Sequence, residues 1–337
     1  VISFSYHASH EQFPPSELLR YVRQAEAAGF DAAFSSDHLQ PWSQAQGHSG
    51  FAWAWLGAAL HSTERMRFAA ITVPGGWRYQ PVVLAQAIAT LGEMFPGRFP
   101  WVALGSGEAL NERATAGRWP SKSSRHARLQ RGAEIISELL DGKTVTRAGP
   151  PSAHEARIWS LPAERTALVG AAVTAATAAW LGSWADGLLT TAGTLEELRA
   201  NVEAFRRNGG EGKPVYVKTQ VCWAETDEQA SRFAFEQWHC NAVPRERCAE
   251  LAQPAHFEHA ARDISTRDVE RVVCVSSDLE RHTAWLRDIA ALGVDGIDIH
   301  QVGRNQAEFI AAFGRHVLPA LRYAPAPRAQ SHSRSMP

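Results

Sequence analysis

The chain has 337 residues, of which 45% are hydrophobic and 20% charged, and its formal net charge is -1. This length suits two average domains or one large barrel. The balanced charge excludes the basic surface that is typical of nucleic-acid-binding and membrane-surface proteins. No apolar run approaches the roughly 20 residues of a membrane span, and the start "VISFSYHAS" lacks the features of a signal peptide. We therefore expect a cytoplasmic protein with no nucleic-acid or membrane partner.

The four cysteines, Cys222, Cys240, Cys248 and Cys274, are scattered without a C-x-x-C pair or ligand-like spacing. This pattern indicates free thiols in a reducing compartment and predicts no metal site. The twelve tryptophans suit a core together with a wide pocket for a flat ligand.

Short β-like runs alternate with amphipathic helices along almost the whole chain. Strands are predicted over residues 1–6, 31–36, 67–73, 98–104, 166–171, 185–191, 214–223 and 296–300. Helices are predicted from Pro15 to a stop at Gly29, over 51–60 and 81–95, around 129–139, after 194, over 279–293 and over 305–321. Thr194 and Glu197 form a T-x-x-E capping box for the fifth of these helices.

Eight strand–helix units predict a parallel sheet, and we interpret them as a (β/α)8 TIM barrel of the α/β class. Residues 1–322 would form this single domain, with a polar, loop-like insertion near 113–123 and helical insertions near 235–270. A doubly wound sheet is the structural alternative. The Pro/Ser/Arg-rich tail, 323–337, has nothing to bury and is predicted to be disordered.

In such a barrel the functional site lies at the carboxyl ends of the strands. His38 is the candidate general base, because imidazole titrates near neutral pH and the neighbouring carboxylate of Asp37 can orient it; a histidine hydrogen-bonded in a turn is the alternative. Glu108, in a glycine-rich loop, is either an acid for proton transfer or an acidic residue at a helix start. Other polar residues at these ends are His7, Ser9, Trp42, Ser106, Asn111, Glu112, Thr190, Thr191 and His300.

Other chemical signals are weaker. His126, His282 and His316 lie on predicted helices and are interpreted as surface or packing residues. "GSGEAL" lacks the third glycine of a dinucleotide-binding fingerprint, and "GGEGKP" has neither the spacing nor the hydroxyl residue of a P-loop.

Four segments together resemble the luciferase-like flavin and deazaflavin oxidoreductases, especially the F420-dependent glucose-6-phosphate dehydrogenase branch. They are "YHASHEQFPPSELL", "SDHLQPW", "WRYQPVVLAQAIATLGEMFPGR" and "GSGEALNE", in this order. The resemblance implies a TIM barrel, a homodimer and a small-molecule substrate. It also implies that His38 takes a proton from the substrate hydroxyl, that Trp42 packs at the reacting centre and that Glu108 supplies a proton to the reduced ring.

The resemblance further implies a set of cofactor contacts. Asp37 would help to hold the cofactor, and Ile71-Thr72 would support the face of its ring, often through a non-prolyl cis peptide. Further contacts would come from Gly105, Gly107 and Asn111 near the ring and from Ala172, Val173 and Thr174 at the phosphate end.

The second half departs from that branch in the residues that would bind phosphate groups. Thr194, Val272 and a position near Cys248 stand where the branch has two lysines and an arginine for the substrate phosphate, so glucose 6-phosphate is not the expected substrate. The turn that cradles the cofactor phosphate with Gly-Gly-Pro is Val173-Thr174-Ala175 here. This favours FMN over F420 and resembles a subgroup that uses ordinary flavin.

These observations predict a luciferase-like oxidoreductase that transfers a hydride between FMN and a small alcohol or carbonyl substrate. An F420-dependent alcohol or sugar dehydrogenase is the first alternative. A reduced-flavin monooxygenase and a non-catalytic flavin-binding barrel are further alternatives, although the presence of both His38 and Glu108 argues against the last.

Overall fold

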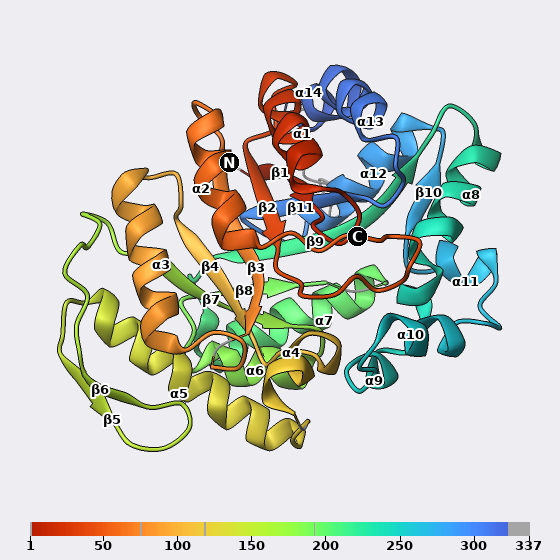
Figure 1. The fold of residues 1–337 in the computed structure, drawn as a ribbon. Helices are drawn as coiled ribbons and strands as arrows, with labels where there is room; N and C mark the ends of the chain where they lie inside the picture. The colour runs from red at the N-terminus through yellow and green to blue at the C-terminus, as the bar shows by residue number, and fades with distance from the viewer. Residues whose placement is uncertain (1, 75, 118, 192, 323–337) are drawn as a thin grey trace, which may run out of the picture.

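The computed structural model describes residues 2–74, 76–117, 119–191 and 193–322, and the predicted disordered tail lies outside the described residues. Eight parallel strands form a ring surrounded by helices (Figure 1). The ring strands are β1 (Ser3–Ala8), β2 (Ala32–Ser36), β3 (Arg67–Pro74), β4 (Trp101–Gly105), β7 (Ala167–Ala172), β8 (Gly187–Thr190), β9 (Val215–Trp223) and β11 (Gly296–Gln301).

Closure of the ring decides between the two predicted architectures. The strand order is β9-β11-β1-β2-β3-β4-β7-β8, and β8 pairs back onto β9, with Leu188 opposite Val215. A doubly wound sheet has two free edges, whereas this sheet has closed on itself. The TIM-barrel prediction is therefore confirmed, and all eight predicted strands correspond to ring strands.

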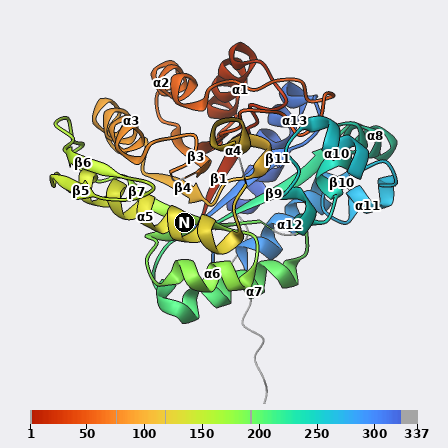
Figure 2. The same ribbon diagram turned by 60° about the horizontal axis from the view of Figure 1, so that its bottom comes forward.

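The helices alternate with the strands and cover the outside of the ring, as the second view shows (Figure 2). They are α1 (Pro15–Ala27), α2 (Ala52–Ser62), α3 (Pro81–Met94), α4 (Ala109–Ala116), α5 (Lys122–Leu140), α6 (Ala175–Gly182), α7 (Leu195–Phe205), α8 (Asp227–Trp238), α12 (Leu279–Ala290), α13 (Gln306–Ala312) and α14 (Leu318–Arg322). The predicted capping box of α7 is present, with the Thr194 hydroxyl accepting from the backbone N–H of Glu197.

Some elements differ from the sequence prediction. The loop predicted over 113–123 is partly wrong, because α4 occupies its first residues. The hairpin of β5 (Val145–Arg147) and β6 (Ala153–Ala156) and the outer strand β10 (Cys274–Ser276), which extends the sheet from the end of β9, are additions. The predicted last helix is one segment in three parts, with the π-helical turn η3 (Phe313–Val317) between α13 and α14. A further π-helical turn, η1 (Arg206–Gly210), follows α7.

Between β9 and β10 the chain forms short helices, where helical insertions are predicted. They are η2 (His239–Ala242), α9 (Arg245–Cys248), α10 (Pro254–Ala260) and α11 (Thr266–Glu270). Their apolar residues form a separate cluster with Leu110 of α4, composed of Cys240, Val243, Phe257 and Ala261. The insertion therefore packs against the loop that carries Glu108.

The middle of the barrel is closed by aromatic rings. Phe34 meets Trp101 edge-on at 4.7 Å between ring centroids, and Trp101 stacks on Tyr216 at 4.3 Å. Burying one such ring stabilises the fold by about 1.5–3 kcal/mol. Above this layer, toward the carboxyl ends of the strands, the interior becomes polar with His7, Lys218, Asp298 and His300. The polar layer forms the floor of the barrel mouth.

All four cysteines are free thiols. No helix in the described ranges is long and apolar enough to cross a membrane. The same residues contain no cluster of three or more His, Cys, Asp or Glu side chains that is arranged to hold a metal ion.

Candidate active site

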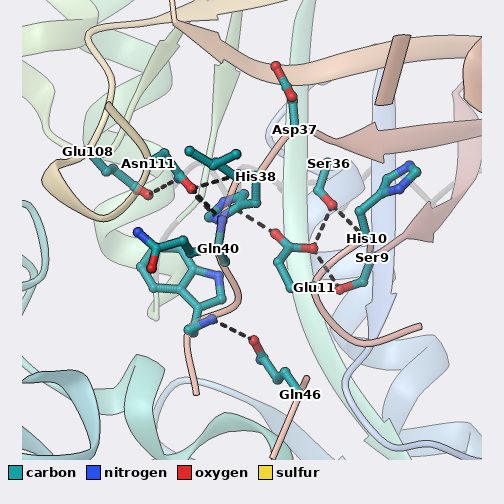
Figure 3. Close-up of polar contacts among 12 residues, drawn as sticks. Ser9, His10, Glu11, Ser36, Asp37, His38, Gln40, Gln46, Glu108 and Asn111 are labelled. Atoms are coloured by element: carbon teal, nitrogen blue, oxygen red, sulfur yellow. Dashed lines mark hydrogen bonds and ion pairs between the residues drawn. The ribbon is translucent and has the colours of Figure 1, made fainter. Parts of the chain in front are cut away.

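The candidate site is built on segments that follow β1, β2 and β4 of the ring (Figure 3). Glu11 lies after β1, His38 after β2, and Glu108 and Asn111 after β4. Because parallel strands place their carboxyl ends at the same end of a barrel, residues far apart in sequence meet there. The barrel thus brings together His38, Glu108 and Asn111, which the sequence predicts for the site.

His38 is held from both sides of its ring. Its Nε2 lies 3.2 Å from Glu11 Oε1, and its Nδ1 lies 3.1 Å from Asn111 Nδ2. The Asn111 Oδ1 accepts hydrogen bonds from the backbone N–H groups of Leu39, at 2.9 Å, and Gln40, at 3.3 Å, which fixes the orientation of the amide. The Nδ1 of His38 also lies 3.3 Å from the backbone carbonyl oxygen of Gln40, so two groups of the loop contact this side of the ring.

Glu11 is a buried carboxylate held in its ionised form. Its Oε2 accepts hydrogen bonds from the hydroxyls of Ser36, at 2.6 Å, and Ser9, at 3.0 Å. Burial by itself would raise the pKa of Glu11, but His38, the Ser36 hydroxyl and Lys218 together lower the pKa below its usual value. An ionised carboxylate at Nε2 stabilises the imidazolium that forms when His38 takes a proton.

This geometry corrects the expected partner of the base. Asp37 was the neighbouring carboxylate expected to orient His38, yet its side chain points away from the imidazole (Figure 3). The Asp37 Oδ1 accepts hydrogen bonds from the Tyr79 hydroxyl at 2.8 Å and from Arg78 at 3.3 Å. Asp37 and His38 lie in the loop beyond the end of β2, and only His38 contacts Glu11.

One carboxylate oxygen of Asp37 has no hydrogen-bond donor among the described residues. This oxygen, Oδ2, is buried. Burial raises the pKa of Asp37 above its usual value, although Arg78 and Tyr79 oppose that rise. Arg78 also binds Glu112, with 2.8 Å between Nε and Oε1, and so ties the end of β2 to α4. The unsatisfied oxygen fits the role of a cofactor contact that the resemblance implies for Asp37.

Glu108 lies on the other side of the same amide. Its Oε2 is 3.5 Å from Asn111 Nδ2, so one amide group lies between the base and this carboxyl. Burial raises the pKa of Glu108, and the nearby charge of Glu11 raises it further, against the opposing effects of His38 and Lys218. A carboxyl with a raised pKa holds its proton to higher pH and is suited to act as an acid.

Trp42 forms an aromatic side of the site. Its ring lies 4.9 Å from the imidazole of His38 and meets Phe257 edge-on at 5.2 Å. Phe257 belongs to the apolar cluster of the insertion and is fully buried. The wall beside the base is therefore hydrophobic, which suits an apolar portion of a substrate.

The surface predicted for a cofactor ring lies between β3 and β4. The peptide bond between Ile71 and Thr72 is cis, as the resemblance implies. A side chain at Gly105 would collide with the Thr72 methyl group, and one at Gly107, where φ is +78°, would lie 2.7 Å from Glu112 Cγ. Only glycine suits these two positions, because the side chains of Thr72 and Glu112 pack directly against their backbone. The residues present fit a flavin or deazaflavin ring.

The predicted phosphate end lies where β7 meets α6. Ala172 is buried, the Val173 side chain is 48% exposed, and Thr174 is the N-cap of α6. The Thr174 hydroxyl accepts a hydrogen bond from the backbone N–H of Thr177 at 3.3 Å. The first N–H groups of a helix beyond such a cap have no acceptor within the helix and can bind an anion.

Beneath the site lies a polar group that contains His7 and His300, which the sequence predicts at the strand ends, together with Asp298 and Lys218, which it does not predict. His7 Nδ1 lies 2.7 Å from Asp298 Oδ2, and the His7 ring lies 4.1 Å from that of His300. Lys218, opposite Asp298 on the neighbouring strand, makes no hydrogen bond or ion pair with any residue that the structure describes. Burial lowers the pKa of Lys218, although Glu11, Asp298 and Glu108 oppose this. The available signal is a lysine within a predicted strand whose neighbours Val217 and Thr219 are buried.

The contact between Glu11 and His38 leads to a direct test. Glu11→Gln keeps the side-chain shape but removes the charge, and we expect kcat to fall about 10- to 100-fold, because a hydrogen bond between charged groups contributes about 1.5–3 kcal/mol. Steady-state kinetics with a saturating cofactor measure this, and the exposed Glu93→Gln on α3 is the matched control. An unchanged kcat in Glu11→Gln would show that Glu11 does not support the base.

Comparisons with known proteins agree with this geometry. Residues 2–296 match the model of the family described as luciferase-like monooxygenase. The F420-dependent glucose-6-phosphate dehydrogenase of Nakamurella multipartita is 35% identical, covering 95% of this chain and 97% of its own, and that of Microbacterium testaceum is 33% identical, covering 95% and 98%.

A solved structure shares both fold and sequence. An F420-dependent secondary alcohol dehydrogenase, in complex with an F420-acetone adduct, has a TM-score of 0.88 and 26% identity, covering 95% of this chain and 99% of its own. The monooxygenase RslO1 from Streptomyces bottropensis, at 18% identity and a TM-score of 0.71, shares the fold. From the family match and these relatives, the chain belongs to the luciferase-like monooxygenase family, as an oxidoreductase close to the F420-dependent glucose-6-phosphate dehydrogenases.

Proposed function

We propose that the protein is an F420-dependent oxidoreductase that moves a hydride between the deazaflavin and the carbon of a small alcohol or carbonyl substrate. The observation that carries the proposal is the arrangement around one amide: Asn111 Nδ2 lies 3.1 Å from the Nδ1 of His38 and 3.5 Å from a carboxyl oxygen of Glu108. A candidate base, His38, and a candidate acid, Glu108, thus lie on either side of the Asn111 amide. Oxidation of an alcohol needs a base for the hydroxyl proton, and an acid can protonate the reduced cofactor.

Each residue of the site has a defined task in this proposal. The imidazole of His38 would accept the hydroxyl proton, and Glu11, 3.2 Å from Nε2, would stabilise the resulting charge. Burial raises the pKa of Glu108, so its carboxyl holds a proton to higher pH than an exposed one and would donate it. The ring cradle at Ile71, Gly105 and Gly107 would hold the cofactor, which when bound supplies the hydride acceptor.

The choice of cofactor differs from the expectation based on the phosphate turn alone. That turn, Val173-Thr174-Ala175, favours FMN because it lacks the glycines of the branch. The helix cap at Thr174 nevertheless leaves the start of α6 available to an anion, so the turn does not decide between the two cofactors. The named relatives at 33–35% identity are F420-dependent, as is the solved alcohol dehydrogenase, and this supports F420. FMN remains the alternative that the experiment below tests.

The proposed substrate carries no phosphate. The Thr194 hydroxyl is used as a helix cap, the Cys248 thiol donates to the carbonyl of Val243, and Val272 packs among apolar residues. Arg271, next to Val272, pairs with Asp268 at 2.7 Å on the surface. No cation stands at these positions to bind a dianion, and the wall beside His38 is apolar.

Cofactor titration followed by turnover tests the proposal. Purified protein is titrated with F420 and with FMN, and binding is measured by fluorescence. We expect F420 to bind at micromolar concentration or below. Small secondary alcohols should then bleach its absorbance, whereas glucose 6-phosphate should not. Tight binding of FMN with no binding of F420 would overturn the choice of cofactor. Binding without turnover of any alcohol or carbonyl compound would favour a flavin-binding barrel without this activity.

A further inference from the structure

Two arginines of α5 lie over two tryptophans at the edge of the barrel mouth. The Arg128 guanidinium carbon is 4.3 Å from the ring centroid of Trp77, and that of Arg125 is 4.4 Å from the ring of Trp119. The two indoles are 5.9 Å apart and tilted by 46°. We call Trp77, Trp119, Arg125 and Arg128 the arginine–tryptophan rim.

The rim adjoins the surface that would hold the cofactor ring. A Cβ placed on Gly107 would be 3.5 Å from the Trp119 ring. On the other side of α5, His126 stacks on Trp180 of α6, with centroids 4.5 Å apart and planes 3° from parallel. The first half of α5 therefore lies between the ring cradle and the helix whose start forms the predicted phosphate end.

The positive charge of this region is not neutralised. Arg128 donates through Nε to the backbone carbonyl of Gly76, and Arg131 donates only to the backbone carbonyls of Ala148 and Pro151. Neither arginine forms an ion pair with a carboxylate among the residues that the structure describes, whereas Arg125 pairs with Glu250 at 3.4 Å. What distinguishes Arg128 and Arg131 is their place beside the tryptophans at the barrel mouth, on a chain whose formal net charge is -1.

Every unsatisfied polar atom of the rim is a donor. The indole nitrogens of Trp77 and Trp119 and the Nε of Arg125 are buried and have no hydrogen-bond partner among the described residues. Polar groups in folded proteins are nearly always paired, so these donors are available to an acceptor outside the described chain. Donors together with unpaired guanidinium groups select an acceptor that is negatively charged.

We propose that the arginine–tryptophan rim, extended by Arg131, binds the carboxylates of the cofactor's glutamyl tail. This inference rests on the proposed use of F420. The tail continues from the phosphate that α6 would bind, and it would pass over the first half of α5, which separates the contact with α6 from the arginines. Carboxylate binding at α5 would compensate for the glycines missing from the turn at Val173-Thr174-Ala175. FMN ends at its phosphate, so it would gain nothing from these arginines.

A series of ligands that share the ring and differ in the tail tests the inference. The dissociation constants of the deazaflavin with only its ribityl chain, of F420 with the phosphate but no glutamate, and of F420 with several glutamates are measured by fluorescence. In the wild type we expect the long-tailed form to bind at least about tenfold more tightly than the form without glutamate. This advantage should shrink at high salt, because exposed charge pairs are screened.

Arginine variants locate the effect. Arg128→Gln and Arg131→Gln, singly and together, should remove most of the advantage of the long tail and leave the affinity for the ribityl form unchanged. Arg199→Gln, an exposed arginine on α7, is the matched control and should keep the advantage. Arg128→Lys keeps the charge and should retain more of the long-tail affinity advantage than Arg128→Gln.

The outcomes separate the two proposals. Equal affinity for all tail lengths in the wild type, or a tail advantage that survives in the double variant, would overturn the inference while leaving the proposed function intact. If the ribityl form and every F420 form fail to bind the wild type, the proposed function itself is wrong. Should the variants fold poorly, as seen by circular dichroism, the tail-length and salt dependence of the wild type still decides the matter.

Discussion

Replacing His38 with alanine should lower kcat/KM for alcohol oxidation by about 10²- to 10⁴-fold, which is the usual contribution of a general base. The imidazole is held between Glu11 and Asn111, and no other described residue within this arrangement can take its place at the substrate hydroxyl. The cofactor affinity should change little, because the ring cradle is formed by β3 and β4. Turnover with saturating F420, together with a binding titration, measures both quantities.

The controls for this experiment separate chemistry from folding. His61→Ala removes an exposed histidine at the end of α2 and should leave both turnover and binding as in the wild type. Comparable melting temperatures would show that His38→Ala has not unfolded the protein. A variant at His38 that retains full turnover would contradict the role of base, and the alternative of a hydrogen-bonded turn histidine would then hold.

Glu108→Gln is the second change with a large expected effect. The amide keeps the shape of the carboxyl but cannot donate an acidic proton. We therefore expect kcat for alcohol oxidation, in which the reduced ring takes up a proton, to fall by about 10²- to 10⁴-fold. The sign of the pH dependence follows from the raised pKa of Glu108. In the wild type the protonated acid persists at low pH and is lost as the pH rises through that pKa.

The pH profile therefore distinguishes an acid from a residue that only supports the loop. In the wild type, kcat for alcohol oxidation should fall as the pH rises through the pKa of Glu108. In Glu108→Gln this alkaline decrease should be absent. Glu93→Gln should keep the wild-type profile, because its side chain is exposed on α3. If both Glu108→Gln and His38→Ala left every turnover unchanged, a non-catalytic flavin-binding barrel would be the better account.

The elements that sequence patterns predict well are those with strong periodicity. The ring strands are apolar runs bounded by turn residues, and α1, α3 and α7 have clear apolar faces. The hairpin β5–β6 was missed because its strands have three and four residues and are mostly not buried. The helix α4, "ALNERATA", was partly predicted as loop because its sequence lacks an apolar stripe.

Only part of the site could be predicted, because contacts between separate segments leave no local pattern in the sequence. The rule that sites lie at the carboxyl ends of barrel strands predicts a wide set of polar residues that includes His38, Glu108 and Asn111. The roles of His38 and Glu108 come from the family resemblance. The rim of Trp77, Trp119, Arg125 and Arg128 joins loops and a helix that no single motif connects. Its unpaired donors become visible only when the hydrogen bonds of the whole structure are known.

The sequence by itself determined the eight strand–helix units and the ends of the strands at which chemistry occurs, because hydrophobic periodicity and polar strand ends are local properties. Tertiary structure decided the closure of the ring through β8 and β9 and the partner of His38. Asp37 is adjacent in the chain, yet Glu11 makes the contact. A hydrogen bond depends on distance and direction in space, and the barrel brings the loop after β1 to the imidazole while the backbone turns its neighbour away.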